Sequence, residues 1–136
     1  MAKEMSDKNT GEDIKINYFA IPGCEAAILA LCLQDSDYVL EVAHQLDDVG
    51  FLVPQNQKFF WLLKRLYKDG VHKFDFSVIK LEAQQCFSVN DIGGEKYIDS
   101  LFQKEVDSDH FLFYMDKLKN AYLKWRTYCL HRESAS

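Results

Sequence analysis

The sequence predicts an all-α fold that ends in one long helix. Apolar residues recur at steps of three and four in several segments between residues 20 and 130, which is the spacing of amphipathic helices. Proline, glycine and short polar residues separate these segments at positions where helices begin and end. No run of alternating apolar and polar residues is typical of a strand.

Length and composition predict a single domain with a substantial core. The chain has 136 residues, of which 48% are hydrophobic and 14% aromatic. A domain of this length buries roughly two-thirds of the surface that its unfolded chain exposes. Residues 1–19 are polar and lack periodicity, so we expect a disordered polar arm there.

The first two helices are predicted between Pro22 and Gly50. Pro22 and the acidic Glu25 mark a helix start, and the residues that follow are apolar on most faces. We therefore expect this helix at the centre of the core. Asp35 and Ser36 are candidate N-caps for a second helix, which stops near Gly50.

Two further helices are predicted in the middle of the chain. Asn56 is the expected N-cap of a helix whose apolar stripe extends from Phe59 to Leu66. Gly70 provides its C-terminal stop, because glycine adopts the backbone angles that end a helix. Asp75 is the expected N-cap of the next helix.

A loop, a short helix and the long final helix complete the chain. Residues 88–94 are predicted to form a loop, in which Gly93 or Gly94 has a positive φ angle. A short helix is expected over residues 97–102. The final helix is expected over residues 109–130.

A heptad-like seam along the final helix is the candidate partner-binding surface. It consists of Phe111, Met115, Leu118, Tyr122, Trp125 and Cys129. The pattern lasts nearly three repeats, a little short of a coiled-coil assignment. Tyr122 and Trp125 lie late in the seam, and aromatic residues of this kind are favoured interface anchors. The alternative is that the stripe folds back onto the first helix as ordinary core.

The charge balance disfavours direct binding to nucleic acid. The formal net charge is −5, from 16 Lys and Arg against 21 Asp and Glu, whereas proteins that bind phosphates are usually basic. Lys117, Lys119, Lys124 and Arg126 cluster on the final helix and keep DNA binding open as an alternative. We prefer to interpret them as a solvated face opposite the seam.

The sequence contains no candidate metal site, membrane span or secretory signal. Its cysteines are far apart and form no C-x-x-C pair, as expected of reduced thiols in a cytosolic protein: Cys24, Cys32, Cys86 and Cys129. The four histidines also stand far apart and lack metal-ligand spacing. The longest apolar run, residues 26–33, is too short to cross a bilayer. We therefore expect a cytoplasmic protein.

No catalytic or cofactor-binding residue is predicted. A phosphate-binding loop of the form G-x-x-x-x-G-K-[ST] is absent, and Lys96 after the paired glycines lacks the required spacing. The acidic residues lie mostly at predicted helix ends, where capping explains them. No nucleophile has a base nearby in the predicted elements, so we expect this chain by itself not to be an enzyme.

Three short motifs carry a family resemblance. They are Ile21-Pro22-x-x-Glu25-Ala26-x-Ile28-Leu29, Phe51-x-x-Pro54-x-x-x-x-Phe59 and Ile92-Gly93-Gly94-x-x-Tyr97-Ile98. Each joins a turn signal to the apolar start of a helix, the turn residues being Pro22, Pro54, Gly93 and Gly94. In this order, and followed by a long helix, they resemble the amino-terminal domain of the DnaB-type replicative DNA helicases over residues 21–130.

The resemblance implies a non-catalytic collar domain that acts through protein contacts during DNA replication. In that family a compact helical head is followed by a long helical hairpin. Pairs of domains associate into a ring, and the hairpins receive primase while loader proteins act nearby. Residues 20–104 would then form the head, and residues 105–136 would hold the first, projecting arm of the hairpin.

The resemblance also bears on the rest of the protein. The second arm of the hairpin would follow Ser136, so we interpret the chain as a fragment of a longer, ATP-dependent DNA helicase. ATP and magnesium would then bind in a missing motor domain. The alternatives are a stand-alone collar mimic that regulates a replicative helicase, and an unrelated helical adaptor.

Two departures from the family pattern indicate a divergent member and are compatible with a phage source. Family members commonly carry a small, glycine-bearing segment in the first helix, where this chain has Ala30-Leu31-Cys32. They often place a His-Arg pair after the proline of the second motif, where this chain has Gln55-Asn56-Gln57. These changes affect the expected contacts more than the expected fold.

Overall fold

The structure is a computed structural model that describes residues 19–46 and 50–135, with side chains as far as His131. The described residues contain six α-helices and two short 3-10 helices and no strand, which confirms the all-α prediction. The polar arm predicted for residues 1–19 lies, except for Phe19, outside the described residues.

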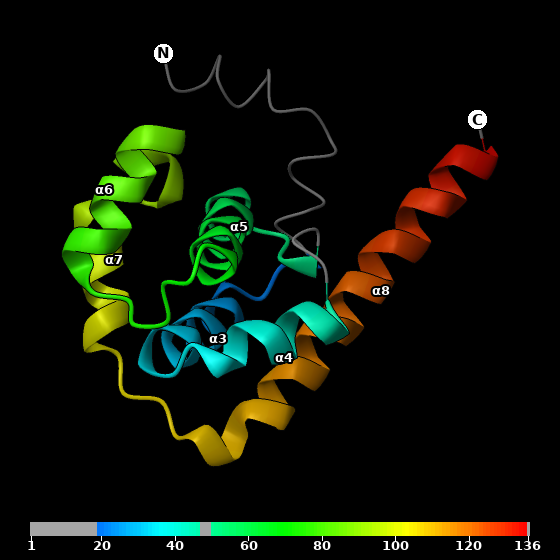
Figure 1. The fold of residues 1–136 in the computed structure, drawn as a ribbon. Helices are drawn as coiled ribbons and strands as arrows, with labels where there is room; N and C mark the ends of the chain where they lie inside the picture. The colour runs from blue at the N-terminus through cyan, green and yellow to red at the C-terminus, as the bar shows by residue number, and fades with distance from the viewer. Residues whose placement is uncertain (1–18, 47–49, 136) are drawn as a thin grey trace.

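Helix α3 (Pro22–Gln34) lies at the centre of the domain, as its all-round apolar sequence predicted. Its residues from Ala27 to Leu33 are all buried. Four helices pack directly against it, namely α4 (Asp37–Gln45), α5 (Pro54–Lys68), α7 (Glu95–Gln103) and α8 (Phe111–Ala135). Helix α6 (Phe76–Cys86) packs on α5 and α7 at the outside of the head (Figure 1).

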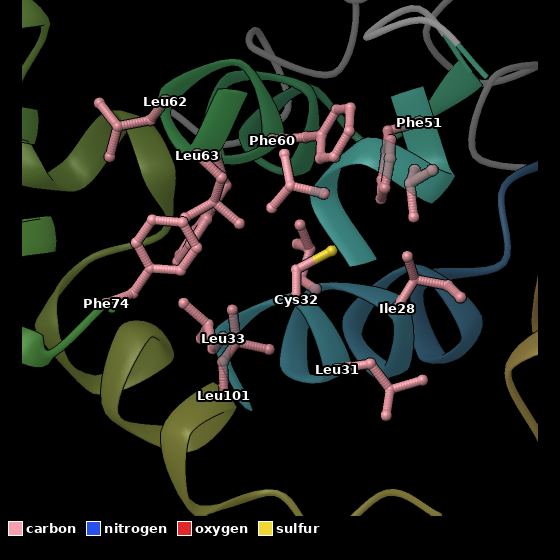
Figure 2. Packing of buried hydrophobic residues seen from close by; sticks show 14 of the residues in the cluster. Ile28, Leu31, Cys32, Leu33, Phe51, Phe60, Leu62, Leu63, Phe74 and Leu101 are labelled. Atoms are coloured by element: carbon pink, nitrogen blue, oxygen red, sulfur yellow. The ribbon is translucent and has the colours of Figure 1, made fainter. Parts of the chain in front are cut away.

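The core lies between α3 and α5. Figure 2 shows Phe60 and Leu63 of α5 facing Cys32 of α3, and the ring of Phe51 stacks on Phe60 with centroids 5.1 Å apart. Cys32 is fully buried, and this burial raises the pKa of its thiol far above the ordinary range. A thiol in such surroundings behaves as a small apolar residue. All four cysteines of the chain are free.

Several predicted helix ends are confirmed. The Asp75 carboxylate accepts a hydrogen bond of 2.8 Å from the amide of Val78 in the first turn of α6. The Asp35 carboxylate accepts one of 3.0 Å from the amide of Asp37 at the start of α4. Gly70 follows α5 with a φ angle of +93°, which an L-residue resists and glycine tolerates.

Three local predictions were wrong. The second helix, expected to stop near Gly50, already ends at Gln45. Asn56 does not cap α5, because the helix already begins at Pro54 and the extended residue before it takes the N-cap position. The segment 88–94 is not simply a loop, since Val89–Ile92 form the 3-10 helix η2. A capping box closes its start, in which the Asp91 carboxylate accepts a hydrogen bond of 3.0 Å from the amide of Ser88.

Helix α8 is the longest element and has two different surroundings. It follows the 3-10 helix η3 (Ser108–His110) and has 25 residues, or about 37 Å at 1.5 Å per residue. Its first half packs against α3 and touches α4 through Phe111 on Tyr38 and Lys119 at Gln45, and its second half extends beyond the other labelled helices (Figure 1). Helix α8 continues five residues past its predicted end. Among the described helices, none is long and apolar enough to cross a membrane.

Candidate functional site

The three sequence motifs meet at one buried carboxylate. Glu25 lies in the first turn of α3 and is only 1% exposed. Its Oε2 accepts a hydrogen bond of 2.9 Å from the amide of Leu52, and its Oε1 accepts one of 3.3 Å from the amide of Val53. The Asn56 side-chain amide donates a third, of 2.9 Å, to Oε1. Both carboxylate oxygens are therefore engaged by protein donors.

Asn56 extends this network to the third motif. Its Oδ1 accepts a hydrogen bond of 2.5 Å from the hydroxyl of Tyr97, a residue 41 positions further along the chain. Glu25, Asn56 and Tyr97 thus come one from each motif, and two hydrogen bonds join them in series, the first buried and the second partly buried. Sequence reasoning treated the motifs as separate turn signals and missed this link. A buried acid inside an apolar helix was the available clue.

The electrostatic role of Glu25 follows from where its donors lie. The amides of Leu52 and Val53 stand just before α5, where a helix leaves unpaired N–H groups and a partial positive charge. The carboxylate therefore fixes the backbone that leads into α5, although it belongs to a different helix. Burial raises the pKa of Glu25, and the three N–H donors oppose that increase. Burial likewise raises the pKa of Tyr97. The network acts as a structural clamp between α3, α5 and α7.

The paired glycines position Tyr97 in this clamp. Gly93 and Gly94 have φ angles of +108° and +87°, as the loop argument predicted. A Cβ atom on Gly93 would lie 2.2 Å from Cδ2 of Tyr97, a distance that no real contact allows. The turn therefore needs glycine at residue 93 both for its backbone angle and for the close approach of the tyrosine ring.

The heptad-like seam on α8 divides into two parts. Phe111, Met115 and Leu118 are 6%, 1% and 1% exposed, and they belong to the core cluster that includes α3. These three side chains are buried within the domain. While the domain is folded, they cannot belong to the partner-binding surface that was predicted for the whole seam. Tyr122, Trp125 and Cys129 are only half-buried, and for them partner binding stays a prediction.

The second half of α8 carries an aromatic cluster. The ring centroid of Phe19 lies 5.9 Å from that of Trp125 and 5.6 Å from that of Tyr128. Trp125 and Tyr128 also stack on each other at 5.8 Å, one helical turn apart. A shallow groove of about 410 Å³ adjoins them, lined by Phe19, Leu123, Lys124, Thr127 and Tyr128. Sequence reasoning missed Tyr128, because it lies one position off the heptad pattern.

Leucines are exposed on another face of the same helix. Leu112, Leu123 and Leu130 are 71%, 58% and 55% exposed. At about 100° per residue their spacings of eleven and seven place them on one face, about 100–120° around the helix from the centre of the seam. The second half of α8 therefore exposes apolar side chains on two sides. Helices with this pattern are usually covered by other helices, and exposed apolar patches mark interaction sites. We call residues 122–130 the distal surface.

Three of the four basic residues that the sequence groups on α8 contact neighbouring side chains within the chain, whereas Lys124 lines the groove beside Tyr128. Lys119 Nζ donates a hydrogen bond of 3.1 Å to Gln45 Oε1, and Arg126 donates one of 3.3 Å to the hydroxyl of Tyr122. The ammonium of Lys117 lies 5.2 Å from the ring centroid of Phe113. In the described part of the chain, no three His, Cys, Asp or Glu side chains are grouped so that they could hold a metal ion.

One comparison with known proteins identifies a family, and a second shows a similar fold. Residues 20–120 match the family model described as the DnaB-like helicase N terminal domain. The fold is similar to the crystal structure of the N-terminal domain of DnaB helicase from Mycobacterium tuberculosis, with a TM-score of 0.70 and 20% sequence identity. That match covers 79% of this chain and 76% of the other. None of the curated proteins compared with the chain matches it.

Proposed function

Because this chain belongs to the family of DnaB-like helicase N-terminal domains, we propose that it is a non-catalytic association and docking module of a replicative DNA helicase. It mediates subunit association and receives primase or a helicase loader in the cytoplasm. The distal surface is the observation that carries this proposal, because its half-buried aromatics and exposed leucines need a partner to cover them.

The module works through protein contacts rather than through DNA or chemistry. Its net charge of −5 and the engagement of Lys117, Lys119 and Arg126 with neighbouring side chains support this part of the proposal. ATP and magnesium would act in a separate motor domain of the full-length helicase. A stand-alone collar mimic that regulates a helicase remains the second candidate, whereas the family match rules out an unrelated helical adaptor.

Trp125→Asp tests the proposal. Trp125 is half-buried against aromatic rings at the far end of α8, so a charge there should leave the head folded. The variant should keep its helical circular dichroism signal but lose self-association in analytical ultracentrifugation, or lose capture of a primase helicase-binding domain. A stand-alone mimic would in addition lower the unwinding rate of an intact helicase that is mixed with it.

Two matched variants give the test its controls. Met115→Asp places the same charge in the core, where Met115 is 1% exposed, and should unfold the domain. Leu81→Asp alters an exposed leucine on α6 and should change neither folding nor association. If Trp125→Asp behaves like Leu81→Asp in every assay, the distal surface is not the interface and the proposal is wrong.

A further inference from the structure

A second apolar and basic surface lies between α4 and α5, away from the distal half of α8. A groove with a cavity volume of about 570 Å³ opens there. Its lining residues are Val39, Leu40, Ala43, Trp61, Lys64, Arg65, Tyr67 and Lys68. Helix α4 supplies only apolar side chains to this lining, whereas α5 supplies two aromatic rings and all three cations. We call this feature the α4–α5 groove.

Leu40 provides an apolar contact at the edge of the groove. It is 44% exposed, although Val39 beside it is only 1% exposed and belongs to the core. The concave, mostly apolar lining with a few charged groups is the usual character of a binding site. A single exposed leucine needs no explanation, but one that borders such a cavity can anchor an apolar side chain of a partner.

The cations on α5 give the groove a charge opposite to that of the whole chain. Lys64, Arg65 and Lys68 lie within about one turn, in a protein whose net charge is −5. Arg65 also binds the Glu82 carboxylate at 3.1 Å. The helix dipole favours cations at this end of α5, yet it does not require them to line an apolar cavity. A local positive patch of this kind attracts acidic partners and orients them.

The aromatic rings of the groove favour a peptide over a nucleic acid. The Trp61 ring meets Phe87 edge-on at 5.3 Å and carries the Arg65 guanidinium 5.6 Å from its centroid. The Tyr67 ring stacks on His72 at 4.2 Å. These contacts occupy ring surface on which bases would have to stack. A peptide needs only the apolar cavity and the cations at its edge.

From charge and shape together, we propose that the α4–α5 groove binds an acidic peptide segment of a partner protein. The segment carries one large apolar side chain, which packs against Leu40 in the cavity. Its carboxylates lie at Lys64 and Lys68 on the α5 side. This mode of recognition combines an apolar anchor with charge-assisted hydrogen bonds.

Fluorescence anisotropy of the full chain with a short fluorescein-labelled peptide tests the proposal. The probe carries Asp and Glu residues around one Phe, and a second probe carries Lys in place of the acids. The acidic probe should bind the parent chain. Lys64→Glu combined with Lys68→Glu should weaken that binding about tenfold or more, because like charges then face each other. The reversed variant should instead bind the lysine probe.

The matched control is Lys96→Glu combined with Lys104→Glu, which makes the same change in net charge at exposed positions outside the groove. Its affinity for the acidic probe should stay within about twofold of the parent's affinity. This is well under the change of about tenfold, or about 1.4 kcal/mol in binding free energy, that is expected of the groove variant. Leu40→Asn should weaken binding without loss of helical signal, because Leu40 is already 44% exposed.

Four results would overturn the proposal. The parent chain could fail to bind the acidic probe, or the groove and control variants could bind it equally. Labelled single-stranded DNA could bind in place of the peptide and depend on Lys64 and Lys68, which would make the ligand a nucleic acid. The groove variants could reduce self-association and leave peptide binding intact, which would make the occupant a second copy of the chain.

Discussion

Replacing Glu25 with alanine should remove the clamp that joins the three motifs. The carboxylate is 1% exposed and accepts hydrogen bonds from the amides of Leu52 and Val53 and from the side chain of Asn56. Alanine offers none of these donors an acceptor.

The magnitude follows from the burial of the donors. The hydrogen bonds from Leu52 and Asn56 are buried, whereas that from Val53 is partly buried and also the longest. An unsatisfied buried polar group costs about 1–3 kcal/mol, so the two buried donors together cost about 2–6 kcal/mol. Domains of this size are stable by only about 5–15 kcal/mol. The variant should therefore lose a large share of its stability.

Urea denaturation followed by far-ultraviolet circular dichroism measures this loss. Glu41→Ala is the matched control, because Glu41 is exposed on α4 and loses the same carboxylate in a helix. It should stay within about 0.5 kcal/mol of the parent, as surface substitutions usually do. If Glu25→Ala also unfolds within about 0.5 kcal/mol of the parent, the network contributes nothing and the clamp argument is refuted.

Three further predictions concern the same network. Burial raises the pKa of Glu25 in the folded state above its value in the unfolded state. The stability that Glu25 contributes is therefore complete at pH values below the unfolded-state pKa and is lost as pH rises through the folded-state pKa. The stability difference between the parent and Glu25→Gln, measured by urea denaturation, should thus fall as pH rises above about pH 4, and a constant difference would contradict this. Tyr97→Phe should cost about 1–2 kcal/mol, because Asn56 loses a 2.5 Å hydrogen bond, and a melting curve equal to the parent's would count against it. Gly93→Val should destabilise the domain more than Gly94→Val. Both add backbone strain of about 1–2 kcal/mol, but only a valine at residue 93 would also collide with Tyr97. If urea denaturation shows equal losses of stability for the two variants, the collision with Tyr97 is relieved by a shift of the ring.

Helix ends and the central helix were predictable because their causes are local. Asp75 reaches an amide three residues away, and Gly70 needs only its own backbone angle. The all-round apolar character of α3 likewise predicted its central place without knowledge of its neighbours. The ordered motifs indicated the family through the same short-range signals.

Only the tertiary structure showed what the polar residues inside those motifs do. Asn56 looked like a cap for its own helix, because a side chain near a helix start usually binds the nearest free amide. Its partners are Glu25 and Tyr97, which are 31 and 41 residues away in the sequence, and the burial of Glu25 and Asn56 beside the half-buried Tyr97 decides the pairing. Spacing along the chain carries no information about contacts over such separations.

The point where the α8 seam changes from core to surface was likewise decided by packing. The apolar spacing continues unchanged from Phe111 to Cys129, so the sequence by itself determined a long helix with one apolar stripe. Leu118 is 1% exposed and Trp125 is half-buried, although both lie on that stripe. The difference arises because α8 is longer than the helices that cover it, and a helix end that leaves its neighbours keeps its periodicity but loses its cover.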